Sequence, residues 1–170
     1  TVMVRAKVYD TTGFLLYLEA EDAERQGGMI RKEDPNARGG AAVYAAEMTD
    51  EGDPETAALE FTFTVPETGD YYLRARVLAP GPNPALHDSF LAALNDDEPA
   101  RWDFSPTPPP DHWEWQPISF DRRNAIGRYH LAAGEHRLRV YRRESLAHLD
   151  AIVVTTHPGI EPPSPREPAP

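Results

Sequence analysis

The sequence contains no cysteine, so it has neither a disulfide framework nor a metal site built on thiolates. It also contains no apolar run approaching the roughly 20 residues that a helix needs to cross a bilayer, and no signal peptide is visible. We therefore expect no membrane partner. The absence of disulfides is compatible with a bacterial secreted domain as well as with a cytosolic one.

Basic residues are scarce, because 17 Lys and Arg face 28 Asp and Glu, which gives a net charge of −11. A phosphate backbone is bound through Lys and Arg, so nucleic acid is not the expected partner. One stretch departs from this balance, the arginine-rich segment 122–143, in which Glu135 is the single acid. Its arginines are Arg122, Arg123, Arg128, Arg137, Arg139, Arg142 and Arg143. Two interpretations stay open: the segment binds an anionic ligand, or its arginines pair with surface acids.

The sequence motifs of common hydrolases are also missing. There is no Gly-x-Ser-x-Gly, no His-Glu-x-x-His, and no close pair of histidines on one face. Carboxylate pairs abound in so acidic a chain, so the choice of a glycosidase pair would be arbitrary. The sequence therefore predicts a protein that is not an enzyme.

Period-two alternation is the clearest pattern that is present. Residues 59–65 and 71–77 each alternate apolar and polar side chains, as strands with one buried face do. Because the loop 66–70 between them is short and contains Gly69, we predict that the two strands form a β-hairpin. Turn residues recur every eight to twelve positions along the chain. The predicted fold class is all-β, a two-sheet antiparallel β-sandwich of jelly-roll topology with about ten strands.

The 170 residues suffice for one domain with its own core. We expect residues 1–13 to form an N-terminal extension or edge strand, residues 14–157 the β-sandwich, and residues 158–170 a proline-rich linker. The chain begins with Thr1, and we expect it to be part of a larger multidomain polypeptide and monomeric within it.

Two apolar stretches carry carboxylates. If residues 16–22 form a strand, Glu19 and Glu21 share one face about 6–7 Å apart. The stretch 147–154 places Asp150 inside a second hydrophobic run, and a jelly-roll can make an early and a late strand neighbours. Three outcomes stay open: the acids are solvated, Arg25 or Arg38 pairs with them, or a hard cation such as Ca²⁺ binds between their oxygens.

These same stretches resemble carbohydrate-binding modules of families 6 and 35. The similarity rests on E-A-E-D at residues 19–22, on a following Gly-Gly, and on the closing strand L-D-A-I-V-V-T at residues 149–155. It runs from Leu16 to Thr156 and covers most of the chain. The resemblance implies a β-sandwich jelly-roll, of the kind mostly appended to bacterial polysaccharide-degrading enzymes.

The resemblance also implies a structural Ca²⁺ ion. Its ligands would be the carboxylates of Glu19, Glu21 and Asp150 and a backbone carbonyl in the loop at Arg38 to Ala41. Glycines 39 and 40 suit such a loop, because glycine lets the backbone turn its carbonyls toward an ion.

The sugar site implied by the resemblance combines an aromatic residue of the W-x-W region with one near the Gly-Gly loop. We predict Trp113 as the platform, with Tyr44 beside it, the alternative being that Trp113 packs within its loop, and we expect Trp115 to be a core residue. His148 stands where the resembled families often have asparagine, and its imidazole can bond a hydroxyl or a carboxylate. Weaker candidates are Asn95 and Arg143.

Together these features predict a non-catalytic carbohydrate-binding module that targets an attached polysaccharide-degrading enzyme to its glycan. The expected partner is a polysaccharide or oligosaccharide, either neutral or anionic, and the expected location is extracellular or periplasmic. Two alternatives stay open. One is a structural or adhesion module of the same fold that binds protein, and the other is a small polysaccharide lyase or esterase.

Overall fold

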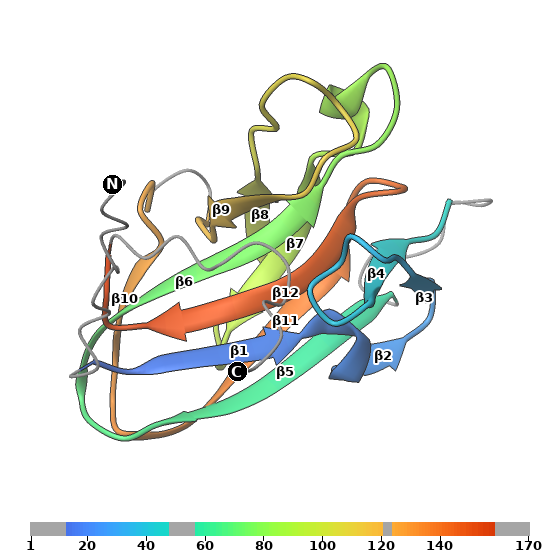
Figure 1. Cartoon of the computed structure of the whole chain (residues 1–170). Helices are drawn as coiled ribbons and strands as arrows, with labels where there is room; N and C mark the ends of the chain where they lie inside the picture. The colour runs from blue at the N-terminus through green and yellow to red at the C-terminus, as the bar shows by residue number, and fades with distance from the viewer. Residues whose placement is uncertain (1–12, 48–56, 121–123, 159–170) are drawn as a thin grey trace, which may run out of the picture.

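The computed structural model describes residues 13–47, 57–120 and 124–158. The predicted N-terminal extension and proline-rich linker lie outside these residues, except for Gly13 and Pro158. The described chain forms two antiparallel sheets packed face to face, and β6 and β12 of one sheet cross in front of β7 and β11 of the other (Figure 1). The prediction of an all-β sandwich is confirmed, with twelve strands in the described residues where about ten were expected.

The seven-stranded sheet has the order β10-β6-β12-β4-β3, with β1 also pairing with β12 and β9 with β6. Its strands are β1 (Leu15–Glu19), β3 (Met29–Glu33), β4 (Ala41–Ala45), β6 (Gly69–Leu78), β9 (Glu114–Pro117), β10 (Arg128–Leu131) and β12 (His148–Thr155). The five-stranded sheet has the order β2-β5-β11-β7-β8. Its strands are β2 (Glu24–Gln26), β5 (Ala58–Val65), β7 (Ser89–Leu94), β8 (Ala100–Asp103) and β11 (Gly134–Arg142). The short 3-10 helices η1 (Ala20–Asp22) and η3 (Pro84–Leu86) complete the elements.

The core lies between the two sheets and is filled by alternate residues of the longer strands. Leu59, Phe61, Phe63 and Val65 of β5 face Tyr71, Leu73, Ala75 and Val77 of β6, and all eight are buried. Both alternating patterns were therefore read correctly for burial. No helix in the described part of the chain is long and apolar enough to span a membrane.

The predicted hairpin between β5 and β6 is wrong. β5 pairs with β2 and β11 in the five-stranded sheet, whereas β6 pairs with β9, β10 and β12 in the seven-stranded sheet. The short loop between them carries the chain from one sheet to the other. Alternation shows which face of a strand is buried, and two strands can bury their apolar faces against each other across a core as well as side by side.

The first and last described strands are neighbours, as a jelly-roll allows. β1 pairs antiparallel with β12 over its whole length, from Leu15 opposite Thr155 to Glu19 opposite Ala151. The two described ends of the chain thus lie together at one end of the sandwich (Figure 1). This pairing brings the two acid-bearing stretches of the sequence side by side.

Candidate functional site

Asp150 lies where β12 changes its neighbour. Residues 148 and 149 of β12 pair with β4, residues 151–155 pair with β1, and the register with β6 shifts between Leu149 and Ala151. This irregularity leaves Asp150 between two pairings, at the point where β4 and β1 meet. Its side chain is fully buried, so the carboxylate needs partners close by.

Glu19 and Glu21 come from the end of β1. The strand ends at Glu19, and Ala20–Asp22 form the 3-10 helix η1, closed by a hydrogen bond from the amide of Ala23 to the carbonyl of Ala20. The expectation that one strand presents both glutamates on one face is therefore wrong. The two carboxylates still meet Asp150, because each of the three acids offers an oxygen and these oxygens lie within 4.8 Å of one another.

Two arginines contact this acidic cluster of Glu19, Glu21 and Asp150. Arg76 on β6 donates from Nη1 to Oδ2 of Asp150 at 2.5 Å. The backbone amide of Arg38 donates to both oxygens of Asp150, at 3.1 and 2.9 Å, and its guanidinium forms an ion pair with Glu19.

Three carboxylates therefore face two guanidinium groups at the cluster. Of the two arginines weighed as partners for the acids, Arg38 does pair with one of them. Arg25, the other, lies on β2 in the five-stranded sheet.

The donor set of the cluster fits a hard cation. Oε2 of Glu19 and Oε2 of Glu21 are buried without a hydrogen-bond partner, and such orphaned acceptors are costly unless a cation or donor reaches them. Burial is the main cause that raises the pKa of Glu21, and the charge of Asp150 raises it further. Burial likewise raises the pKa of Asp150. Oxygen-only carboxylate ligation is the kind that Ca²⁺ prefers.

Because Gly39 has no side chain, the Glu21 carboxylate can lie against its backbone. A Cβ added at residue 39 would lie 2.1 Å from Oε1 of Glu21 and 3.6 Å from Oε2 of Glu19. Any larger residue would push the Glu21 carboxylate away from the cluster. The glycine pair was expected to free backbone carbonyls, and at Gly39 the structure adds this second, steric reason.

Three aromatic rings gather on the next part of the same sheet. Tyr44 on β4 and His148 on β12 are cross-strand partners, and their rings stack with centroids 5.2 Å apart. Trp113, in the loop before β9, meets the edge of His148 at 6.1 Å. The sequence predicted all three as sugar-site residues, and the structure brings them together.

His148 is held in one tautomer. Its Nδ1 lies 2.6 Å from the carbonyl oxygen of Leu146, which can only accept, so Nδ1 carries the proton and Nε2 is left as an acceptor. Burial lowers the pKa of this imidazole and keeps it neutral near pH 7. His148 can therefore accept a hydrogen bond from a hydroxyl.

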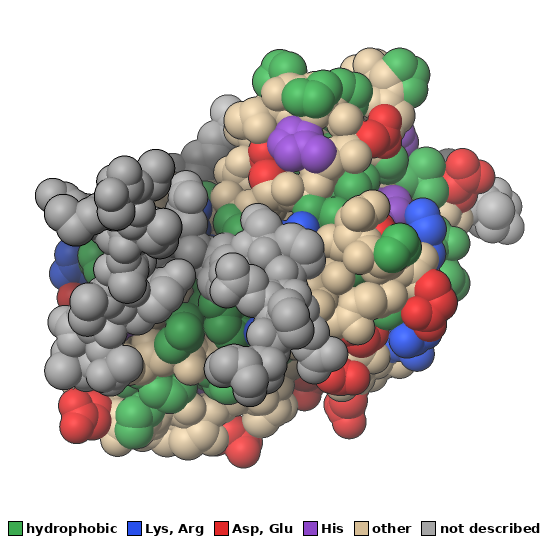
Figure 2. Space-filling model, viewed as in Figure 1, with side chains coloured by type: hydrophobic (Ala, Val, Ile, Leu, Met, Phe, Trp, Pro, Cys, Tyr) green, Lys and Arg blue, Asp and Glu red, His purple; other side chains and the backbone are tan. Residues whose placement is uncertain are grey.

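Trp113 also borders a cavity of about 330 Å³. The other lining residues are Asp34, Asn36, Arg76, Leu78, Asp111 and His112. They come from the 34–40 loop, the end of β6 and the 104–113 loop, and in Figure 1 the 104–113 loop rises at the top of the picture, above the 34–40 loop. Figure 2 shows hydrophobic side chains at the top of this region, with a histidine and acidic side chains just below them.

The orientation of Trp113 is fixed by a residue that the sequence analysis missed. Its indole Nε1 donates to Oδ2 of Asp34 at 3.1 Å, while Oδ1 of Asp34 accepts from the amide of Asn36 at 2.8 Å. Asp111, also in the lining, accepts through Oδ1 from the amide of Gly81 at 2.7 Å. The D-P-N turn at residues 34–36 was the one available signal, and turn propensity alone gives no function.

Of the predicted sugar-site residues, Trp113 lines this cavity, whereas His148 contacts Trp113 and Tyr44 stacks on His148 without lining it. The other two lie elsewhere. Asn95 follows the far end of β7, where its side chain contacts His136 and the amide of Arg137. Arg143 donates to Ser89 and Glu144 beside the start of β7.

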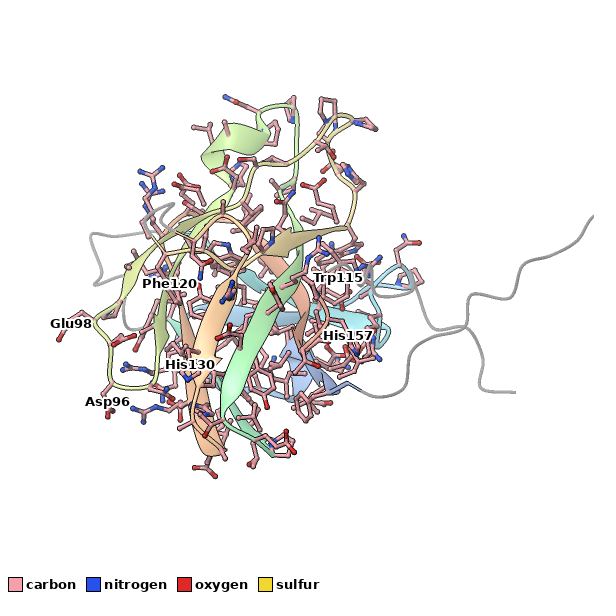
Figure 3. All side chains as sticks on the ribbon, turned by 90° about the vertical axis from the view of Figure 1, so that its left-hand side faces the viewer. Asp96, Glu98, Trp115, Phe120, His130 and His157 are labelled. Carbon is pink, nitrogen blue, oxygen red and sulfur yellow. The ribbon has the colours of Figure 1, made fainter. Side chains whose placement is uncertain are left out.

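The expectation that Trp115 is a core residue is wrong. It lies on the outer face of the seven-stranded sheet, opposite Arg76, with its ring 6.3 Å from that of Tyr17 (Figure 3). The core tryptophan is instead Trp102, which is 0% exposed.

Comparison with solved structures supports the fold. A family 35 carbohydrate-binding module from Clostridium thermocellum has a TM-score of 0.65 at 20% identity, covering 83% of this chain and 98% of that one. The Podospora anserina GH26-CBM35 beta-(1,4)-mannanase has a TM-score of 0.61 at 18% identity, covering 92% of this chain and 28% of the mannanase. The isomalto-dextranase of Arthrobacter globiformis T6 has a TM-score of 0.63 at 18% identity, covering 82% of this chain and 23% of the isomalto-dextranase.

These likenesses confirm the fold implied by the sequence resemblance to family 35 modules. No curated protein sequence matches the chain. One family model matches residues 31–163, most of the described sandwich, and its description is "Glycosyl hydrolase family 115 C-terminal domain". The chain therefore belongs to the family of glycosyl hydrolase family 115 C-terminal domains.

Proposed function

We propose that this domain is a non-catalytic glycan-binding module whose sugar site is the cavity beside Trp113. The observation that carries the proposal is the indole itself, oriented by Asp34 at the border of a cavity of about 330 Å³ with polar walls. Ligand sites typically combine an apolar surface with a few fixed polar groups. An indole face suits the C–H face of a pyranose, and the surrounding carboxylates and amides suit its hydroxyls.

Each aromatic neighbour has a distinct part in this proposal. Trp113 is the platform, and the neutral His148 accepts a hydroxyl through Nε2 or keeps the platform in place by its edge contact. Tyr44 stacks on His148 and stiffens that ring rather than touching the sugar first. Because the rings support one another, the site is held in shape before the ligand arrives, which lowers the entropic cost of binding.

The proposal includes a structural Ca²⁺ held by Glu19, Glu21 and Asp150. The ion would supply positive charge to carboxylates that burial otherwise disfavours. Asp150 is hydrogen-bonded to the amide of Arg38, and Arg76 donates to the carbonyl oxygen of Asn36 at 2.9 Å as well as to Asp150. The acidic cluster therefore anchors the same 34–40 loop whose residues line the sugar cavity.

We further propose that the module targets an enzyme to its substrate. The family description names a C-terminal domain of a glycosyl hydrolase, and the similar mannanase carries its sandwich within one longer chain. A tethered glycan-binding domain raises the local concentration of the enzyme on its polymer without new chemistry. We propose an extracellular or periplasmic location for the same reason, since polysaccharide substrates lie there.

The test is a glycan array followed by calorimetry. The wild-type protein should bind at least one saccharide, Trp113→Ala should lose that binding while its thermal unfolding stays cooperative, and Trp115→Ala should keep it. Trp115 is the matched control because it is also a partly exposed tryptophan, two residues further along on β9, but does not line the cavity. If no saccharide binds, or if Trp113→Ala binds as tightly as wild type, the proposal is wrong and a structural or protein-binding module is favoured.

A further inference from the structure

The described arginines of the arginine-rich segment, from Arg128 on, do not line the sugar cavity. Arg128 pairs with Asp70, and Arg137 lies 3.6 Å from Asp96. Arg139 donates to the carbonyl oxygens of Asn95 and Asp97, at 3.0 and 3.2 Å. Arg143 pairs with Glu144. For these described members of the segment, the interpretation that they pair with other groups of the fold is the one the geometry supports, and none of them lines the cavity.

Among the described residues that line the cavity, the one arginine is already engaged. Arg76 is 7% exposed, and its Nη1 donates both to Asp150 and to the carbonyl oxygen of Asn36. Its guanidinium lies 5.6 Å from the centre of the Trp113 ring, beneath the platform. A ligand carboxylate would have to compete with Asp150 for this positive charge, and removing one partner of a buried ion pair is strongly unfavourable.

The remaining charged lining of the cavity is acidic. Asp34 and Asp111 both line the cavity, each anchored by a backbone amide, and Glu114 lies 3.1 Å from the lining residue His112. A carboxylate has about four acceptor positions, so each of the two aspartates keeps acceptor capacity beyond the bonds just described. Sugar hydroxyls can donate to such oxygens, whereas a ligand carboxylate can only repel them.

Resting on the proposed function, we propose that this cavity selects neutral saccharides and rejects uronates, and that Asp111 and Asp34 set this specificity. Neutral sugars present several O–H donors to two fixed acceptors, which gives short, charge-assisted hydrogen bonds. A uronate places a negative charge near both carboxylates. At a separation of about 4–6 Å and an effective dielectric between that of water and that of a protein surface, this repulsion weakens binding roughly tenfold or more.

The test compares saccharides that differ in charge and share their stereochemistry. Oligosaccharides of glucose, galactose and mannose are titrated by calorimetry beside the oligouronates of the same three sugars. Methyl-esterified oligogalacturonate is included, because esterification removes the charge and keeps the ring hydroxyls. The neutral member of at least one pair should bind roughly tenfold or more tightly than its uronate, and the ester should bind more tightly than the free acid.

Two variants assign the effect to a residue. Asp111→Asn keeps the oxygen that accepts from Gly81 and removes one negative charge. It should therefore reduce the ratio of the affinity for the neutral saccharide to the affinity for its uronate at least threefold. Glu98→Gln makes the same charge change in the turn between β7 and β8, far from Trp115 and the cavity, and should leave the ratio unchanged (Figure 3). Raising NaCl from 20 to 500 mM should screen the repulsion and so bring the affinity for the uronate closer to that for the neutral saccharide, while the affinity for the neutral saccharide stays nearly unchanged.

The outcomes separate this inference from the proposed function. If a uronate binds as tightly as its neutral counterpart, or more tightly, with or without added Ca²⁺, the inference is wrong while glycan binding stands. If none of the saccharides binds, both fall together. An Asp111→Asn protein that fails to unfold cooperatively would leave the comparison of the free acid with its ester on the wild-type protein as the deciding result.

Discussion

Arg38 and a calcium ion should compete for Glu19, and replacing Arg38 with methionine tests this. The guanidinium of Arg38 pairs with Glu19 and lies 3.9 Å from the centre of the Tyr17 ring. With Arg38 and Arg76 present, the three carboxylates of the acidic cluster keep one net negative charge. Without Arg38 they keep two, which is the charge that a divalent cation neutralises.

The size of the effect follows from burial. The side chains of Arg38 and Glu19 are 24% and 19% exposed, so their pair is worth more than an exposed salt bridge of about 0–1 kcal/mol. A hydrogen bond to a charged group typically contributes about 1.5–3 kcal/mol, and discounting for the remaining exposure gives about 1–2 kcal/mol. For a domain of this size that is a fall in melting temperature of about 2–8 °C in chelator.

In saturating Ca²⁺ the destabilisation caused by Arg38→Met should shrink or vanish, because the ion neutralises the Glu19 carboxylate in place of the guanidinium. By linkage the variant should bind Ca²⁺ about 5–30-fold more tightly than wild type, the factor that corresponds to 1–2 kcal/mol. The assay is thermal unfolding in chelator and in a Ca²⁺ series, with calorimetry for affinity. Arg101→Met is the matched control, since Arg101 pairs with Asp103 on β8. Equal destabilisation of Arg38→Met in both conditions, with unchanged affinity, would refute the competition.

Trp102→Ala should destabilise the domain by about 3–5 kcal/mol in urea unfolding, because Trp102 is fully buried, whereas Trp115→Ala should cost clearly less. Gly39→Ala should weaken Ca²⁺ binding in calorimetry more than it lowers the melting temperature in chelator, because its Cβ displaces the Glu21 carboxylate. Burial, and then the charge of Glu144, raise the pKa of Asp88 to about 6 from 3.8. Its contribution to stability is therefore fully present below about pH 4 and is lost as the pH rises through 6. Asp88→Asn should make the free energy of unfolding depend less on pH across that window and should raise it at pH 7, as measured by urea unfolding at several pH values.

The sequence sufficed for the features that depend on local periodicity. Alternation in β5 and β6 identified their buried faces correctly, because burial of one face is what the period of two records. It could not say which sheet each strand joins, and the hairpin prediction failed there. The pairing of β1 with β12 was expected from the predicted jelly-roll topology, since no local signal links strands more than a hundred residues apart.

The site was predictable in part for the same reason. Trp115 was expected in the core, but it pairs with Arg76 on the outer face of the sheet and packs on Tyr17, which its spacing along the chain alone does not show. Asp34 and Asp111 lie in turns and proline-rich loops, where side-chain direction depends on tertiary contacts and not on a period. Glu21 reaches the acidic cluster only because the chain turns into η1 after Glu19, a detail that alternation cannot contain.

The three tryptophan indoles allow the most direct test of the glycan site. Each gives its own Nε1–H signal in a nitrogen–proton correlation spectrum, so one titration with the best-binding saccharide reports on all three environments at once. The signal of Trp113 should shift, because its indole is bonded to Asp34 at the border of the cavity. The signals of Trp102 and Trp115 should stay in place. A shift at Trp115 alone, or a bound saccharide that leaves all three signals unmoved, would contradict the account.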